Sequence, residues 1–327
     1  MCKLLNIENL TIVANEKNRK VKITDNVSLS LNSGESMGII GESGCGKSIT
    51  ALSILGLNNP NINIIDGNIF FENICLNKLS SGNLRKICGS KIGMIFQEPM
   101  TALNPVFTIE QQLSEPLKIH LKLSKSAIKS KCIELLESAG IKNASAMLKY
   151  YPHQLSGGMR QRVVIAMAIA CKPKLLIADE PTTALDVTIQ AQILHIIKKL
   201  IKENNMALLI ISHDIGVISK LSQEVSVMYS GEIIEQDSKT NIIENPMHPY
   251  SEKLINSAKE LNNGCNHLSV VNGSVPRPEE NIMGCKFTAR CEFCRNICKE
   301  NKPSLIKKNN GNRYVRCWKY INDQNLY

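Results

Sequence analysis

The sequence contains few aromatic residues and no long apolar run. Aromatic side chains make up 4% of the 327 residues, so the chain offers few stacking platforms for single-stranded nucleic acid. The longest apolar run, at 163–171, ends at Lys172 and is far shorter than the ~18 residues that a membrane-spanning helix needs. The first residues also lack the apolar core of a signal peptide. We therefore expect a cytosolic chain that does not cross a membrane by itself.

Positive charge is the main excess in the composition. The net charge is +10 at pH 7, with 43% hydrophobic and 21% charged residues, which is the balance of a globular protein of about two domains. A basic chain can bind nucleic acid, anionic lipid headgroups or phosphate ligands. We favour an ordinary solvated basic surface over a nucleic-acid groove, and we expect no nucleic-acid partner.

The twelve cysteines are unevenly distributed. Seven are spread over the first 265 residues, and five lie between Cys285 and Cys317. This spacing does not fit a secreted disulfide scaffold. In a reducing compartment, a cluster near one end of the chain predicts a metal site.

Apolar strands and amphipathic helices alternate along most of the chain. A glycine-rich loop follows one of the strands, and beyond about residue 236 prolines, asparagines and cysteines increase, which predicts a separate C-terminal extension. The alternation predicts a parallel sheet covered by helices on both faces. The predicted strands are 27–31, 37–40, 175–178 and 207–211, and the predicted helices are 49–57, 124–139, 159–171 and a long one with apolar residues from Ile189 to Ile201.

The glycine-rich loop matches the pattern G-x-x-x-x-G-K-[ST]. Its glycines let backbone N–H groups point at phosphate oxygens, and the helix that follows adds its positive N-terminal end. Lys47 is expected to reach the β- and γ-phosphates and Ser48 to ligate Mg²⁺. A chance glycine-rich turn is the alternative, and the strand before and helix after disfavour it. The predicted phosphate-binding segment is Gly41, Glu42, Ser43, Gly44, Cys45, Gly46, Lys47, Ser48 and Ile49.

Two carboxylates follow the apolar strand at 175–178. Asp179 is placed to hold Mg²⁺, and Glu180 is the candidate that polarises an attacking water. His213 follows the next apolar strand, so we expect it at the same edge of the sheet, near the γ-phosphate. An ordinary acidic pair at a strand end is the alternative for the carboxylates, and the phosphate loop makes it less favoured.

A further segment gives the chain a family resemblance. Residues 155–162, Leu-Ser-Gly-Gly-Met-Arg-Gln-Arg, resemble the signature motif of ATP-binding cassette (ABC) ATPases. The order of the motifs matches the whole cassette: the phosphate loop, Gln97, the signature, Asp179-Glu180, Asp186 and His213. The resemblance implies an α/β P-loop core with a mostly parallel sheet, an antiparallel N-terminal β subdomain and a helical subdomain at about 99–165.

The cassette resemblance also implies roles and partners. Two cassettes would pack head to tail around ATP and Mg²⁺, with Ser156, Gly157, Gly158 and Gln161 of one facing the nucleotide of the other. Glu180 and His213 would be catalytic. Gln97 would sense Mg²⁺ and water and touch a membrane subunit, and Asp186 would lie at the dimer contact.

A finer resemblance points to the dipeptide/oligopeptide importer ATPases, and within them to the D-type subunit. It rests on Tyr-Pro-His-Gln at 151–154, on 179–188 and on Asn-Pro-Met-His-Pro-Tyr at 245–250. It implies a cassette at 1–235, an extension at 236–327, and a subunit bound peripherally at the cytoplasmic face of the membrane. The implied partners are an F-type cassette or a second copy, two membrane permeases and, indirectly, an extracytoplasmic binding protein. Nickel importers share much of the pattern, so nickel remains an alternative cargo.

The resemblance has one departure and one addition. Where cassettes carry an aromatic residue that stacks on adenine, this chain has Ala14, although Ile23 offers apolar contact. Four cysteines of the extension reproduce a C-x5-C-x6-C pattern with a distant fourth, which in some relatives holds an iron–sulfur cluster. Four thiolates suit [4Fe–4S] or Zn²⁺, and the wide spacings favour iron–sulfur over zinc or free cysteines. The proposed ligands are Cys285, Cys291, Cys298 and Cys317, with Cys294 as an extra thiol.

Two other functions remain to be weighed against a transport ATPase. Soluble cassette proteins that act on DNA or ribosomes carry coiled-coil insertions or two cassettes, and this sequence has neither. A silent partner that binds but does not hydrolyse ATP is disfavoured by Glu180 and His213.

Overall fold

The computed structural model describes residues 3–16, 19–262, 273–277, 279–280, 282–308 and 313–321. The chain divides into two compact units, each made of three segments. The first unit comprises Met1–Leu4, Leu31–Ser36 and Lys78–Ile210, and the second comprises Leu5–Ser30, Met37–Asn77 and Ile211–Tyr327.

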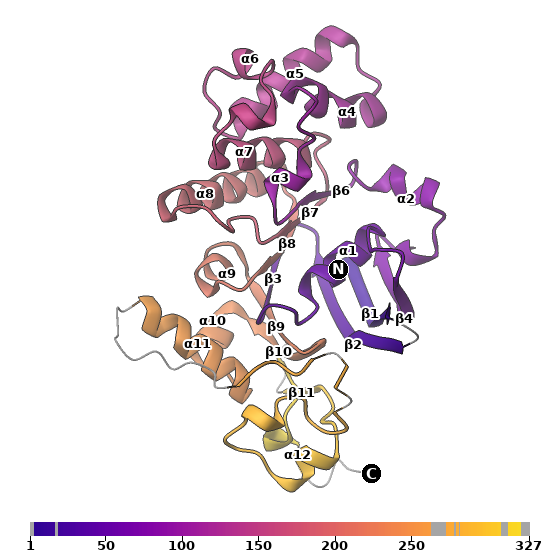
Figure 1. The fold of residues 1–327 in the computed structure, drawn as a ribbon, viewed down its shortest axis with the longest axis vertical. Helices are drawn as coiled ribbons and strands as arrows, with labels where there is room; N and C mark the ends of the chain where they lie inside the picture. The colour runs from indigo at the N-terminus through magenta and orange to yellow at the C-terminus, as the bar shows by residue number, and fades with distance from the viewer. Residues whose placement is uncertain are drawn as a thin grey trace. The chain divides into compact units, whose positions relative to one another are not determined.

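The first unit combines three strands of a larger sheet with a group of helices (Figure 1). The order of these strands is β8-β7-β6, and β6 pairs in parallel with β7. Helices α4, α5 and α7 pack against one another. The elements are α2 (Ser81–Ile87), β6 (Ile92–Ile95), α3 (Pro99–Ala102), α4 (Ile109–Leu121), α5 (Lys125–Ser138), α6 (Ala144–Met147), α7 (Gly157–Ala168), β7 (Leu175–Asp179), α8 (Val187–Asn204) and the first residues of β8 (Ala207–Ser212).

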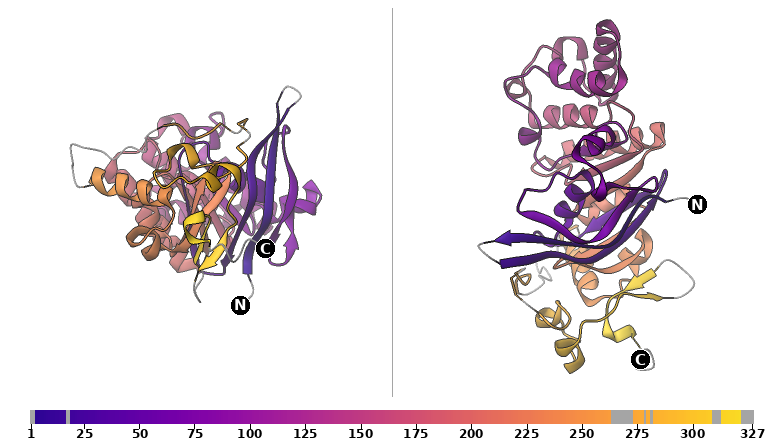
Figure 2. Two further views of the ribbon diagram at one scale, coloured as in Figure 1. Left: turned by 90° about the horizontal axis from the view of Figure 1, so that it is seen from below. Right: turned by 90° about the vertical axis from the view of Figure 1, so that its right-hand side faces the viewer.

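The second unit contains an antiparallel sheet, whose long strands are drawn in indigo in Figure 2. Its strand order is β2-β1-β4-β5. Apolar side chains of β1 such as Leu5, Leu10 and Ile12 are fully buried. The elements are β1 (Lys3–Glu16), β2 (Arg19–Asn32), β4 (Ile62–Phe71) and β5 (Ile74–Cys75).

Five strands of a larger sheet lie in this unit, together with the phosphate loop and the C-terminal part of the chain. Their order is β11-β12-β10-β9-β3, with β3 parallel to β9 and the other pairs antiparallel. Helix α10 packs on β9 and β10. The elements are β3 (Ser36–Ile40), α1 (Lys47–Leu55), α9 (Ile215–Leu221), β9 (Glu224–Tyr229), β10 (Glu232–Ser238), α10 (Lys239–Glu244), α11 (Pro249–Asn262), α12 (Asn296–Glu300), β11 (Ile306–Lys308) and β12 (Arg313–Val315).

The predicted α/β class and the antiparallel N-terminal sheet are confirmed. The strands expected at 37–40, 175–178 and 207–211 are β3, β7 and β8, and each is buried throughout. The helix expected at 49–57 instead spans Lys47–Leu55, because Gly56 in the left-handed conformation ends it. The helix expected at 159–171 begins at Gly157, because Ser156 caps it. Among the described residues, none of the helices combines the length and apolar character needed to span a bilayer.

Candidate functional site

The phosphate loop lies between a buried strand and a helix in the second unit, as predicted. Strand β3 runs directly into Gly41, and α1 begins at Lys47. Gly46 has a φ of 101°, a backbone conformation that glycine adopts without strain. A Cβ on Gly41 would lie 2.2 Å from the Met228 carbonyl oxygen. The loop therefore needs glycine at Gly41 for close packing and at Gly46 for its turn.

The side chain of Lys47 is folded into the loop. It is 5% exposed, and its Nζ donates to the carbonyl oxygens of Gly41 at 2.7 Å and Glu42 at 2.8 Å. The same Nζ lies 3.6 Å from the Cys45 sulfur. Burial raises the pKa of the Cys45 thiol, although the Lys47 charge opposes the shift. Cys45 is therefore a neutral buried side chain, and the ammonium group is already positioned inside the loop.

A cavity of about 560 Å³, whose lining includes both basic residues and Asp25, Glu279 and Glu280, lies beside the exposed tip of the loop at Gly44. Ile23 lines it, together with basic side chains from β2 and from the C-terminal extension. Ala14 is not among its lining residues; it is buried in β1, where it pairs with Ile62 of β4. The positive side chains that line the cavity are Arg19, Lys20, Lys22, Arg277 and Lys286.

The two predicted carboxylates lie at the carboxyl end of β7 in the first unit. Asp179 is the last residue of the strand and is 4% exposed. Glu180 follows with a φ of 45°, an uncommon conformation for a residue with a side chain. Its Oε2 accepts hydrogen bonds from Gln97 Nε2 at 3.2 Å and from Thr183 Oγ1 at 2.9 Å. The structure thus brings together Gln97 and Glu180, which sequence analysis assigned to one site.

The signature segment forms the N-terminus of α7 in the same unit. Ser156 is the N-cap, and its Oγ accepts a hydrogen bond from Met159 N at 3.3 Å. Ser156 and Gly157 are exposed and Gly158 is partly exposed. A helix start with exposed glycines and a hydroxyl can bind an anion through its N–H groups and its positive dipole end.

Gln161 behaves differently from the rest of the signature segment. Its side chain is 1% exposed, and its Nε2 donates to the Pro181 carbonyl oxygen at 2.7 Å. Pro181 directly follows Glu180, so this bond ties α7 to the backbone beside the carboxylate.

Asp186, the N-cap of α8, is exposed. Ile189, three residues further on, lies close enough to Gly158 to contact a Cβ placed there.

His213 follows β8 in the second unit and is exposed. Next to it, Asp214 caps α9, with its side chain accepting from Gly216 N at 2.7 Å. The loop that carries His213 is thus fixed where it joins α9.

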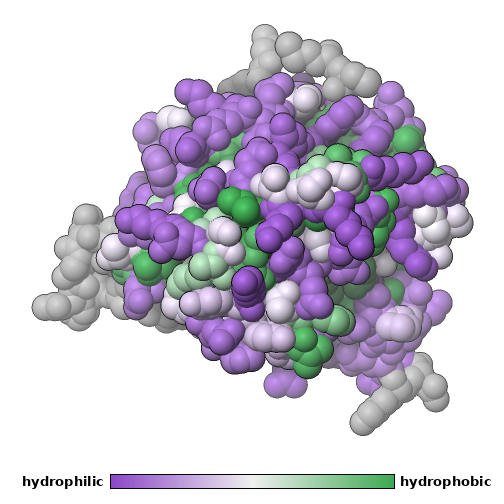
Figure 3. All heavy atoms as spheres, turned by 90° about the horizontal axis from the view of Figure 1, so that it is seen from above, coloured by the Kyte–Doolittle hydropathy of each residue, from purple (hydrophilic) through white to green (hydrophobic). Residues whose placement is uncertain are grey.

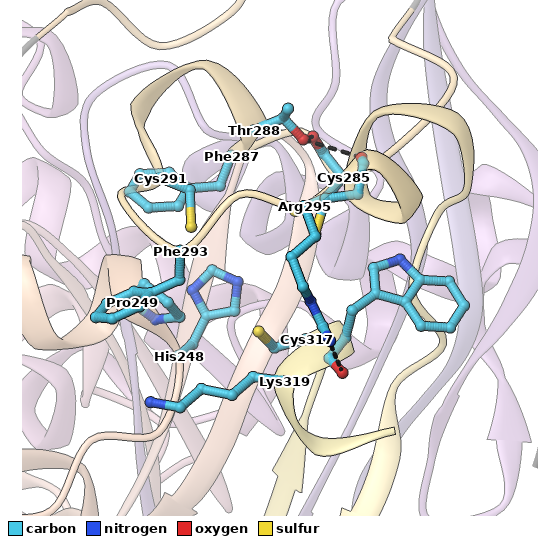
Figure 4. Close-up of a pocket in the computed structure, with 12 residues that line it drawn as sticks. His248, Pro249, Cys285, Phe287, Thr288, Cys291, Phe293, Arg295, Cys317 and Lys319 are labelled. Carbon is cyan, nitrogen blue, oxygen red and sulfur yellow. Dashed lines mark hydrogen bonds between the residues drawn. The ribbon is translucent and has the colours of Figure 1, made fainter. Parts of the chain in front are cut away.

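The four predicted cluster cysteines line one cavity of about 280 Å³ in the C-terminal extension, around which Figure 4 shows Cys285, Cys291 and Cys317. The thiols are free, and burial raises the pKa of Cys285 to about 12. Cys294 does not line the cavity. Within the described ranges, no group of three or more His, Cys, Asp or Glu side chains is arranged to hold a metal ion.

The basic residues near these thiols have different partners from one another. Arg295 does line the cavity and donates to the Trp318 carbonyl oxygen at 2.8 Å. Arg290, however, pairs with Glu42 of the phosphate loop, and Lys286 pairs with Glu232. Sequence analysis missed the Arg290–Glu42 pair because 248 residues separate its members.

Two family models match the chain. The ABC transporter model matches residues 24–183, which include the phosphate loop and the carboxylates at the end of β7. The model of the oligopeptide/dipeptide transporter C-terminal region matches residues 234–298.

Curated relatives and solved structures are also similar to the chain over most of its length. The oligopeptide transport ATP-binding protein AppD of Bacillus subtilis is 44% identical over 98% of both chains. The dipeptide transport ATP-binding protein DppD of Haemophilus influenzae is 41% identical over 98% of this chain and 97% of its own. A dimeric structure of the ATP-binding cassette MJ0796 bound to ADP and phosphate matches with a TM-score of 0.65 at 30% identity, covering 72% of this chain and 98% of that cassette. The structure of cbiO1 from Clostridium perfringens matches with a TM-score of 0.63 at 25% identity, covering 80% and 96%.

Proposed function

The chain belongs to the ABC transporter ATP-binding proteins and carries the C-terminal region of oligopeptide/dipeptide transporters, and we propose that it is the ATP-hydrolysing subunit of a di- or oligopeptide importer. The observation that carries this proposal is the likeness to AppD and DppD over nearly the whole chain. The cassette MJ0796 accounts for 72% of the chain. Part of the remainder matches the region specific to peptide transporters. We assign the cassette to 1–235, with its helical part at about 99–165, and the extension to 236–327.

The Asp179 and Glu180 carboxylates and the phosphate loop would act on one bound ATP. Residues Gly41 to Ile49 would hold the phosphates, and the Lys47 ammonium would leave its loop carbonyls to bind the β- and γ-phosphates. Ser48, Gln97 and Asp179 would hold Mg²⁺. Glu180 would accept a proton from the attacking water, and His213 would contact the γ-phosphate. The hydrogen bonds of Glu180 to Gln97 and Thr183 support this assignment, because they orient the carboxylate.

A second cassette would complete the site. The exposed helix start at Ser156, Gly157 and Gly158 can bind an anion, and the chain already has one phosphate loop for its own nucleotide. We therefore assign this helix start, with Gln161 behind it, to the ATP of a partner, which is a homologous F-type cassette or a second copy. Asp186 would lie at the contact between the two.

The helical part of the first unit would transmit the movement to two membrane subunits that receive peptide from a binding protein. It exposes several large apolar side chains, among them Met100, Val106 and Phe107. Seen from the end where α4 to α6 lie, the surface shows small hydrophobic groups set among hydrophilic ones (Figure 3). We infer that the subunit is bound peripherally, at the cytoplasmic face of the membrane.

The thiol cavity would hold a [4Fe–4S] cluster, with Zn²⁺ as the alternative. Its four cysteines equal in number the thiolates that either group requires, although the described side chains are not arranged to hold a metal ion. Because burial favours the protonated thiol of Cys285, loading would release protons, and it would require the sulfurs to move closer together. Bound there, the cluster would join the segments that carry Cys285, Cys291, Cys298 and Cys317 and so stabilise the fold of the extension.

The proposed function is tested by Glu180→Gln in the assembled transporter. The substitution keeps the size of the side chain and removes its basic group, so MgATP should still bind while hydrolysis falls about 10²-fold or more. Glu203→Gln, on the exposed end of α8, is the matched control and should be silent. Uptake of a labelled dipeptide should fail with Glu180→Gln. Unchanged ATP turnover would contradict the catalytic assignment, and loss of nickel uptake with intact peptide uptake would favour the nickel importer.

A further inference from the structure

The side chain of Glu42, the second residue of the phosphate loop, is held by an arginine of the C-terminal extension. Arg290 Nη1 lies 3.0 Å from Glu42 Oε2, and Arg290 Nη2 lies 3.0 Å from Glu42 Oε1. These two parallel bonds are the bidentate geometry in which an arginine fixes a carboxylate most firmly. The arginine side chain is 5% exposed and that of Glu42 is 27% exposed, so solvent screens the pair only in part.

Aromatic residues fix the arginine and the loop backbone together. Tyr250 Oη accepts a hydrogen bond from Glu42 N at 3.0 Å, and Arg290 Nη1 donates to Tyr229 Oη at 3.3 Å. The rings of Tyr229 and Tyr250 lie 4.6 Å apart, and both contact Phe287. Burial raises the pKa of Tyr250, so its phenol stays neutral and adds no negative charge beside the loop.

Glu42 is consequently held on three sides. Arg290 binds its carboxylate, Tyr250 binds its N–H, and its carbonyl oxygen accepts from Lys47 Nζ at 2.8 Å. The contacts to Arg290 and Tyr250 come from the extension, and the contact to Lys47 comes from the residue that would bind phosphate. A carboxylate in a loop that binds a triphosphate would repel its ligand unless a positive charge offsets it. Arg290 supplies that charge and at the same time fixes the path of the loop.

We propose that Arg290 is a positioning residue for the phosphate loop and that it acts through Glu42, so that the C-terminal extension sets the affinity of the cassette for MgATP. The inference rests on the proposed ATP-binding function and adds a residue that lies outside the cassette motifs. Arg290 does not touch the nucleotide itself. Its contribution is to neutralise Glu42 and to fix the path of the loop.

A double-mutant cycle tests this coupling in the full chain. The dissociation constant of MgATP is measured by calorimetric titration for wild type, Arg290→Gln, Glu42→Gln and the double variant, and circular dichroism and melting temperature report folding. Arg290→Gln should weaken MgATP binding about tenfold, because it leaves the Glu42 carboxylate uncompensated. In the Glu42→Gln background the same substitution should cost at most about twofold, because the charge it compensates is gone.

Two further variants keep the test decisive. Arg290→Lys retains the charge but cannot form both bonds, so its affinity should lie between those of wild type and Arg290→Gln. Arg313→Gln is the matched control, because Arg313 is an arginine of the extension that pairs with Glu235 and Asp237 and should leave MgATP affinity unchanged. If Arg290→Gln does not fold, a cycle of Arg290→Lys, Glu42→Gln and their double variant still reports the coupling.

The outcomes separate this inference from the proposed function. If wild type and Arg313→Gln bind MgATP and Arg290→Gln binds equally well, the positioning role is wrong while the ATPase assignment stands. An equal loss from Arg290→Gln with and without Glu42 would also overturn it, since the arginine would then act elsewhere. If wild type does not bind MgATP, the proposed function fails and this inference fails with it.

Discussion

The bond between Gln161 and Pro181 gives a sharp prediction for hydrolysis. Gln161 Nε2 donates to the Pro181 carbonyl oxygen at 2.7 Å, and the side chain is 1% exposed. Gln161→Leu keeps nearly the same volume, so it leaves little cavity and mainly removes this donor. A buried acceptor that loses its partner costs about 1–3 kcal/mol. The free energy of unfolding of the variant should fall by about that amount.

The effect on catalysis follows from where Pro181 lies. It directly follows Glu180, whose left-handed backbone conformation depends on the surrounding structure to hold it. Without the hydrogen bond from Gln161 to Pro181, the Glu180 carboxylate should spend less time in the geometry fixed by Gln97 and Thr183. We expect kcat to fall about tenfold, which corresponds to about 1.4 kcal/mol in the barrier. The KM for ATP should change little, because the phosphate loop is not altered.

Gln112→Leu is the matched control for this variant. Gln112 is also a buried glutamine, but its three hydrogen bonds go to Asn104 and Phe107, in the segment before α4. It should lower stability at least as much and leave kcat unchanged. The assay is steady-state phosphate release by the full chain with its partner cassette and without membrane subunits, alongside urea unfolding. If Gln161→Leu loses stability but keeps its kcat, the Gln161–Pro181 hydrogen bond does not position Glu180 and the reasoning is refuted.

Two further predictions concern the cysteine cavity and an ion pair at acid pH. Anaerobically purified Cys291→Ser should lose the visible absorbance of an iron–sulfur cluster and Cys294→Ser should keep it, because Cys291 lines the cavity and Cys294 does not. A colourless wild type that contains zinc would show the alternative metal. Burial alone would raise the pKa of Asp25, but hydrogen bonds and charges from Lys302 and Lys22 outweigh it and hold the pKa at about 2. Because this pKa lies below the unfolded value of 3.8, the carboxylate adds about 1–2 kcal/mol above pH 4, allowing for partial exposure, and this is lost as the pH falls towards 2. The unfolding free energies of wild type and Asp25→Asn should therefore differ at pH 6 and converge near pH 2, and a difference independent of pH would contradict the assignment.

The elements that sequence analysis identified are those with a strong local signal. Strands β3, β7 and β8 are short, mostly apolar runs, and α5 has the capping residue Ser124 before its first turn and Gly140 just beyond its end. The phosphate loop and the carboxylates after β7 were identifiable because their chemistry requires fixed residue types at fixed spacing. In each case the information lies within about 20 consecutive residues.

Other elements lacked such a signal. Strand β1 is buried on both sides along much of its length, and its pairing with β4 has register shifts near Thr11, so its side chains do not alternate. Helix α4 contains Pro116, which disfavours a helix in any local analysis. It did carry one usable start signal, since Thr108 and Gln111 form a capping box.

The contacts around Glu42 show a different limit of sequence analysis. Phosphate chemistry constrains the glycines, Lys47 and Ser48 of the loop, but it leaves positions such as Glu42 open, so a motif says nothing about them. A negative side chain at an open position of an anion-binding loop has an electrostatic cost, and a fold that keeps one must compensate it. The motif can thus show that compensation is needed, but not which residue provides it. Here the partner is Arg290, far along the chain in the extension, and only the three-dimensional structure identifies it.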